Sequence, residues 1–177
     1  FLANYDFLIS SKDKFFFITF DDGLKEQFDF AIPILDELGM QAIFFANSMN
    51  TDENRVSTVH KIHLLRSIIS SKELLNYLED QKINMLTIEE SQQAKSNYRF
   101  DDAESAVLKY LLNFKISFDK QELLVNSIFE KYFCESEVLS SLYMSKSQLQ
   151  SLANMKCLGS HTHTHYPLGL LSEDKLT

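Results

Sequence analysis

An unbroken apolar run precedes the first acidic pair of the chain, in the stretch FFFITFDDGL. Such a run is typical of a β-strand buried on both faces, and we expect a strand over residues 14–20. Asp21 and Asp22 follow at once, and carboxylates are costly in an apolar core unless they are paired, hydrogen-bonded or bound to metal. The pattern therefore predicts that the two acids lie where a strand emerges into a cleft.

After Gly23 the apolar positions recur at spacings of three and four, which predicts a helix. We expect Pro33 to stand in its first turn or at a kink, and Gly39 to end it. The stretch QAIFFAN, residues 41–47, then predicts a second buried strand. Strand, helix and strand in succession form a βαβ unit, so the sequence indicates an α/β fold with its ligand site beyond the carboxyl ends of parallel strands.

The middle of the chain, residues 51–144, is polar and repeatedly periodic at helical spacing, which predicts a mainly helical insertion between the second and third strands. Asp101 and Asp102 indicate a helix N-terminus, where acids favour the macrodipole. Residues 146–155 predict one more short helix, and a short third strand is expected to end at Ser160. Four apolar helix faces are expected: Leu64, Leu65, Ile68 and Ile69; Leu74, Leu75 and Leu78; Val107, Leu108, Leu111 and Leu112; and Leu123, Leu124, Ile128 and Phe129.

Composition narrows the class of protein. With 177 residues, 45% of them hydrophobic, the chain can bury the core of a single domain, residues 1–177. Its net charge of −8 argues against nucleic acid as a partner, since binding to phosphates needs a basic face. No apolar run is long enough for a transmembrane segment, and no basic start with an apolar stretch marks a signal peptide. The composition leaves the oligomeric state open.

Cysteine usage bears on the compartment. Cys134 and Cys157 have no CxxC partner, so the chain indicates neither a zinc knuckle nor a disulfide framework. This favours a reducing compartment and hence a cytoplasmic location. The chain begins with Phe1 rather than Met, so we expect its natural N-terminus to lie upstream.

A second polar cluster follows the third predicted strand, in the stretch GSHTHTHYPL. His161, His163 and His165 would share one face of a strand, whereas on a helix His161 and His165 would share a face. Either arrangement suits a divalent metal, although a chance cluster on a polar loop is the alternative. Two imidazoles and one carboxylate from neighbouring strand ends would leave coordination positions open for water and substrate, as catalytic metals require.

These two clusters together resemble a known family. ITFDDG with AIPILDELGMQAIFFAN, and later LGSHTHTHYPL, are similar to the polysaccharide deacetylase or NodB-homology family, which is carbohydrate esterase family 4. The similarity covers residues 14–49 and 146–177 and leaves the helical middle outside. It implies a deformed, TIM-barrel-like (β/α) fold and a metal-dependent hydrolase that deacetylates N-acetylated, or less often O-acetylated, sugars of a polysaccharide or glycan precursor.

The resemblance also implies roles for individual residues. Asp22, His161 and His165 would bind the metal, most often Zn²⁺, with Co²⁺, Mn²⁺ or Ni²⁺ as alternatives. Asp21 would be the general base that deprotonates the attacking water. Thr162 would support the histidine loop by hydrogen bonding.

The other histidines receive no catalytic role. We expect His163 to face solvent or to support a ligand rather than to bind metal itself. His60 and His63 lie three residues apart on a predicted helix and are expected on its surface or on a cleft wall.

The chain also departs from the family. Further family motifs, with an Arg that positions the base, an Asp and Trp pair, and a His that acts as general acid, are missing, and the chain has no Trp. We therefore expect the sequence to be the N-terminal part of a longer deacetylase domain. A phosphatase of the haloacid dehalogenase type fails because it needs two acids with one residue between them. A catalytically incompetent metal-binding or interaction module derived from a deacetylase stays open as the alternative.

Overall fold

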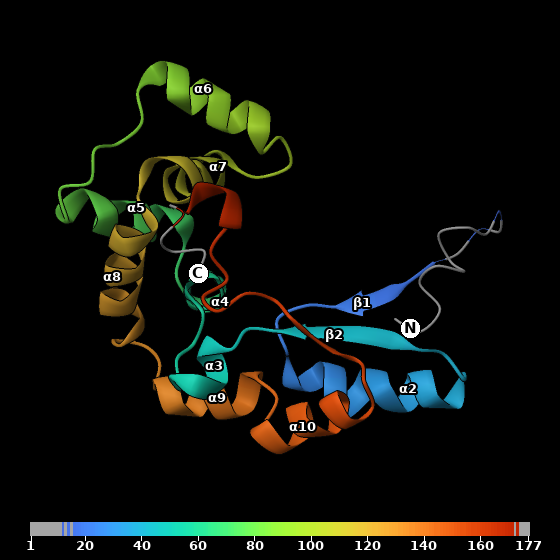
Figure 1. The fold of residues 1–177 in the computed structure, drawn as a ribbon. Helices are drawn as coiled ribbons and strands as arrows, with labels where there is room; N and C mark the ends of the chain where they lie inside the picture. The colour runs from blue at the N-terminus through green and yellow to red at the C-terminus, as the bar shows by residue number, and fades with distance from the viewer. Residues whose placement is uncertain (1–11, 13, 15, 172, 174–177) are drawn as a thin grey trace. The chain divides into compact units, whose positions relative to one another are not determined.

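The computed structural model describes residues 12, 14, 16–171 and 173 of the chain (Figure 1). The chain divides into two compact units. The sheet unit comprises Phe1–Ser48 and Leu142–Thr162, and the helical unit comprises Met49–Ser141 and His163–Thr177. In the described part of the chain, no helix has both the length and the apolar character needed to cross a membrane.

In the described residues of the sheet unit, three parallel strands, β1 (Ile18–Phe20), β2 (Ala42–Ala46) and β3 (Leu158–Ser160), pair in the order β1-β2-β3. The register pairs Phe20 with Phe44 and Phe44 with Leu158, and the Phe20 and Phe44 rings stack with their centroids 4.9 Å apart. The strands are linked by helical segments, so the prediction of an α/β fold with a parallel sheet is confirmed. All three strands end at the same edge of the sheet.

The first strand differs from its prediction. Pairing with β2 covers only Ile18–Phe20 instead of residues 14–20, of which residue 15 lies outside the described part. Burial on both faces is wrong for β1, because Thr19 is exposed and Ile18 and Phe20 are only half-buried. The physical reason is that Ile18 and Phe20 pack against the apolar core on one face of the strand, whereas Thr19 points to the other face, which the described residues leave exposed.

Helices α2 (Ile32–Glu37) and α10 (Lys146–Asn154) pack on one side of this sheet (Figure 1). A π-helical turn (η2, Gln27–Ala31) leads into α2, Pro33 stands in its first turn, and Gly39 follows it at φ +62°, so both expectations for this helix are confirmed. Ser145 begins α10 with a capping box. The buried core of the unit comprises Leu35, Phe44, Met144 and Leu152.

The helical unit is built from short helices joined by tight connections. Asp102 is the N-cap of α7 and accepts a hydrogen bond from the Ser105 N–H at 2.8 Å, which confirms the helix start predicted there. The elements are α3 (Met49–Asp52), α4 (Thr58–Ile68), α5 (Ser71–Asp80), α6 (Ile88–Asn97), α7 (Ala103–Tyr110), a π-helical turn (η3, Leu111–Lys115), α8 (Phe118–Phe129), α9 (Glu135–Leu142) and a 3-10 turn (η4, Leu168–Leu170).

The predicted apolar faces form most of the core of this unit. The prediction is wrong for two residues of these faces, because Ile68 is 54% exposed and Leu123 is 71% exposed. Each directly precedes, in sequence, residues that do face the core, so the helical rotation of about 100° per residue carries its side chain outward.

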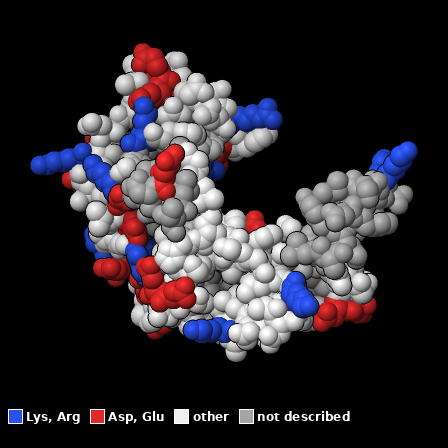
Figure 2. Space-filling view, in the orientation of Figure 1, with Lys and Arg blue, Asp and Glu red and all other residues white. Residues whose placement is uncertain are grey.

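Acidic and basic side chains are interspersed over the helical unit on the face drawn in Figure 2. The predicted insertion at residues 51–144 stays a prediction.

Candidate metal centre

The first cluster is a tight turn directly after β1. Asp22 and Gly23 both adopt left-handed backbone conformations, at φ 74° and φ 63°. A Cβ atom added to Gly23 would lie 2.9 Å from Cβ of Ala46 in β2, so only glycine permits this approach. The turn that carries Asp22 is therefore pressed against the end of β2.

Hydrogen bonds hold this turn in place. The Gln27 side chain donates from Nε2 to the Asp21 carbonyl at 2.6 Å and accepts at Oε1 from the Leu24 N–H at 3.2 Å. The Met144 N–H donates to the Gly23 carbonyl at 2.9 Å. Asp21 itself is exposed, whereas Asp22 is half-buried. The two acids therefore stand in different surroundings although they are adjacent in sequence.

The second cluster begins where β3 ends. The His161 N–H donates to the Ala46 carbonyl at 2.8 Å, and the Ser48 N–H donates to the Thr162 carbonyl at 3.3 Å. Asn47, which is 2% exposed, donates from Nδ2 to the His161 carbonyl. The start of the histidine segment is thus fastened to the residues that follow β2.

The histidine segment is neither a strand nor a helix. Thr162 and His165 both adopt positive φ values, 65° and 62°, which are uncommon for residues other than glycine. Both regular arrangements considered for the three histidines are therefore wrong. The left-handed residues turn the chain, so the alternation in sequence does not decide which imidazoles point the same way.

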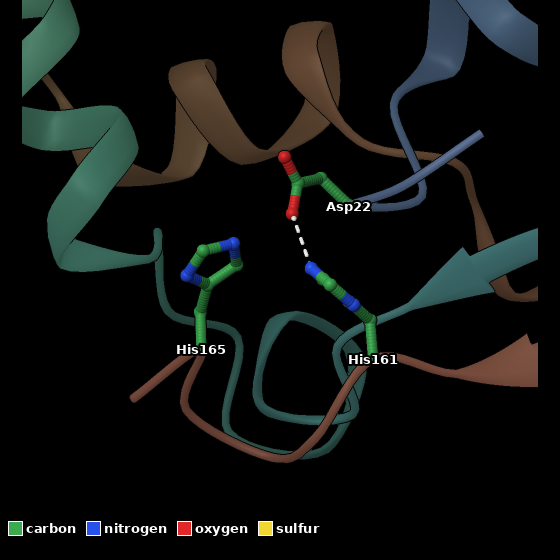
Figure 3. A group of neighbouring side chains, drawn as sticks. All are labelled: Asp22, His161 and His165. Atoms are coloured by element: carbon green, nitrogen blue, oxygen red, sulfur yellow. Dashed lines mark ion pairs between the residues drawn. The ribbon is translucent and has the colours of Figure 1, made fainter. Parts of the chain in front are cut away.

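The structure brings together the three residues expected to bind metal. Nε2 of His161 lies 3.5 Å from Oδ1 of Asp22. One ligand atom from each of Asp22, His161 and His165 lies within 4.8 Å of the other two, and the three side chains point toward one another (Figure 3). A carboxylate oxygen and two imidazole nitrogens are ordinary zinc ligands, at about 2.0–2.2 Å from the ion. The chemistry and the spacing of this donor set therefore fit a divalent metal.

Two other histidines contact different partners. Nε2 of His163 lies 2.7 Å from Oε1 of Glu53, and this hydrogen bond, followed by that from Arg55, holds the pKa of Glu53 below its ordinary value. His163 is exposed. The His60 ring lies with its centroid 6.5 Å from that of His165. Neither residue belongs to the group that could hold a metal ion among the described residues.

Asn47 is a site residue that the sequence did not single out. Its position directly after the apolar run of β2 is the sequence feature that points to it, because a polar residue there is either exposed to solvent or hydrogen-bonded to a specific partner. Its burial and its hydrogen bond to His161 show that it has a specific partner. Asn47 thereby links the end of β2 to the first histidine of the motif.

Comparison with known proteins supports the family resemblance. Residues 9–87 match the family model of polysaccharide deacetylase, which confirms the predicted family for this part of the chain. The matched range includes Asp21 and Asp22 but ends well before His161 and His165. No curated protein and no solved structure matches the chain.

Proposed function

Because residues 9–87 match polysaccharide deacetylase, we propose that this protein is a metal-dependent hydrolase that removes acetyl groups from N-acetylated sugars of a polysaccharide or glycan precursor. O-acetylated sugars are the second choice of substrate. The observation that carries the proposal is the donor set of Asp22, His161 and His165, because these residues come from distant segments of the chain and offer the ligand atoms of a catalytic zinc site.

In this proposal Asp22, His161 and His165 hold the ion, with Zn²⁺ the best match to the donors. When bound, the ion acts as a Lewis acid toward water and the acetyl carbonyl. Asp21 accepts a proton from the attacking water, a role that suits an exposed carboxylate next to a metal ligand. Thr162 supports the loop through its carbonyl, which the Ser48 N–H contacts.

The proposal extends to the fold and the ligand. We propose that the three parallel strands belong to a deformed (β/α) barrel, with the helical segment as an insertion between the second and third strands. An acetylated sugar would approach at the carboxyl ends of the strands, where Asp21 and Asp22 follow β1 and His161 follows β3. This edge is the ordinary ligand site of a parallel sheet.

Substituting the two adjacent acids separately tests the proposal. We expect Asp21→Asn to lower acetate release from an acetylated chito-oligosaccharide by about 10²–10⁴-fold while zinc stays bound, because only the base is lost. Asp22→Ala should lose the zinc itself. Zinc content by elemental analysis and acetate release are measured on the same samples.

Asp36→Asn is the matched control, since Asp36 is an exposed carboxylate of α2 in the same unit. It should leave both zinc content and acetate release unchanged. Full turnover in Asp21→Asn would refute the role of the base, and full zinc content in Asp22→Ala would refute the ligand set. Zinc bound through these residues without any acetate release would favour the catalytically incompetent alternative.

A further inference from the structure

The segment around His165 is held on both sides by carboxylates of the helical unit. Two residues before His165, Nε2 of His163 lies 2.7 Å from Oε1 of Glu53. One residue after it, the Tyr166 hydroxyl donates to Oε2 of Glu122 at 3.0 Å. Glu53 follows α3 and Glu122 lies in α8, so two separate elements of the helical unit flank the same histidine.

The contact at Tyr166 fixes both ends of its side chain. Its ring stacks on Phe118, with centroids 4.8 Å apart and an interplanar angle of 28°. Its hydroxyl reaches Glu122, one helical turn after Phe118 along α8. The residue that follows His165 therefore has little freedom to move.

Arg55 joins the two carboxylates. Its guanidinium makes ion pairs with Glu53, at 3.3 Å, and with Glu122. A planar guanidinium has several donors in a fixed fork, so it can hold two carboxylates in a defined relation. The result is a continuous polar chain whose five members are His163, Glu53, Arg55, Glu122 and Tyr166.

The backbone that carries Arg55 is itself anchored. The buried Asn50 donates from Nδ2 to the Arg55 carbonyl at 2.7 Å. The next residue, Val56, is 2% exposed, and its N–H donates to Oε1 of Glu135 at 2.8 Å. Arg55 is thus attached to a buried part of the helical unit rather than to a loose surface loop.

This arrangement matters because His165 has an unfavourable backbone conformation. A non-glycine residue at positive φ is strained and persists only where its surroundings hold it. We infer that Glu53, Arg55 and Glu122 position His165 for metal binding by holding His163 and Tyr166 on either side of it. This inference rests on the proposed function.

The first test needs no metal. Tyr166→Phe keeps the ring stacking but removes the hydroxyl, and Glu122→Gln removes the charge that pairs with Arg55. In the metal-free protein we expect amide hydrogen exchange of peptides that span His163–Tyr166 to become about 3–10-fold faster in each variant, as expected for the loss of one hydrogen bond or ion pair. Matched controls are the exposed Tyr132→Phe and the exposed Glu130→Gln, which should leave this exchange unchanged.

The second test measures zinc. We expect Tyr166→Phe and Glu122→Gln to raise the dissociation constant for zinc by about 10-fold or more, because partners of metal ligands commonly affect affinity on this scale. Competition with a coloured chelator measures this constant. The thermal unfolding midpoint of the metal-free protein should stay the same, which separates positioning from a general loss of stability.

The outcomes distinguish this inference from the proposed function. Unchanged exchange at His163–Tyr166 in both variants would overturn the positioning inference, whether or not zinc binds. Faster exchange with unchanged zinc affinity would also overturn it, because His165 would then bind without the network. If the unaltered protein takes up no zinc through Asp22 and His161, the proposed function fails, whereas the exchange result still reports on the network.

Discussion

The two units of this protein differ in how much they bury. Among the residues that the structure describes, the helical unit has one cluster of thirteen buried apolar residues, whereas the buried cluster of the sheet unit has four. Both units leave large apolar side chains exposed, for example Phe30 and Leu38 in the sheet unit and Phe100 and Leu123 in the helical unit. The unit that carries Asp21 and Asp22 is therefore the one with the smaller core.

This difference shows that the two units depend on different physical terms. Side-chain packing stabilises the helical unit, because burial of apolar area is its largest favourable contribution. The site-bearing turns of the sheet unit depend on backbone conformation instead, as the left-handed Asp22 and Gly23 show. A change of side-chain volume should therefore be most harmful in the first unit, and a change of backbone freedom most harmful to the site in the second.

The largest effect is expected from the core of the helical unit. Phe129 is fully buried, and Phe129→Ala should lower the free energy of unfolding by about 3–5 kcal/mol, because it removes the ring and leaves a cavity. Urea unfolding followed by far-ultraviolet circular dichroism measures it. Leu123→Ala, on the same helix but 71% exposed, should change the free energy by less than about 0.5 kcal/mol. Similar losses in both variants would contradict the assignment of this core.

A smaller effect, concentrated at the site, is expected from Gly23. Gly23→Ala should lower the free energy of unfolding by about 2–4 kcal/mol, because it combines a left-handed backbone with a methyl group 2.9 Å from Cβ of Ala46. Gly39→Ala is the matched control: its φ is +62°, yet nothing lies within 4 Å of the added atom, so about 1–2 kcal/mol is expected.

Zinc affinity provides a second measurement that separates Gly23→Ala from Gly39→Ala. Gly23→Ala should weaken zinc binding because the turn carries Asp22, whereas Gly39→Ala should leave it unchanged. Equal losses of stability from the two glycine substitutions, with equal zinc affinity, would show that the approach of Gly23 to Ala46 does not hold the site.

The smallest effect concerns the pH dependence of the helical unit. The hydrogen bonds from the Ser105 backbone N–H and then its side chain lower the pKa of Asp102 from its ordinary value of 3.8. Because the folded-state pKa is the lower one, this stabilisation is present above pH 3.8 and is lost as the pH falls through the folded-state pKa. Asp102→Asn keeps a capping oxygen but cannot titrate. Between about pH 6 and about pH 3, the free energy of unfolding should therefore fall less in this variant than in the unaltered protein.

Urea midpoints at the two pH values check this expectation, with Glu104→Gln, exposed in the first turn of the same helix, as the control. An equal fall in the unaltered protein and in Asp102→Asn would show that the N-cap charge does not contribute. The sheet unit should show no response to this substitution.

Local signals in the sequence predicted many of the elements. The helix ends at Gly39 and Asp102 were predictable because left-handed conformations and N-caps select particular residue types. The extent of β1 was not, because an apolar run does not reveal whether neighbours cover both faces of its strand. Ile68 and Leu123 were misplaced for a related reason, since one residue of helical rotation separates a core position from a surface position.

The sequence by itself determined the parallel βαβ start, the helical middle and the residue types of the candidate metal centre, because periodicity, turn residues and ligand chemistry are local properties of a chain. Only the tertiary structure decided how the histidine segment turns, with left-handed conformations at Thr162 and His165. It alone revealed Asn47 and the network of Glu53, Arg55 and Glu122. Except for the ion pair between Arg55 and Glu53, these contacts join residues far apart in the sequence, and no local pattern encodes which distant partner a polar side chain will meet.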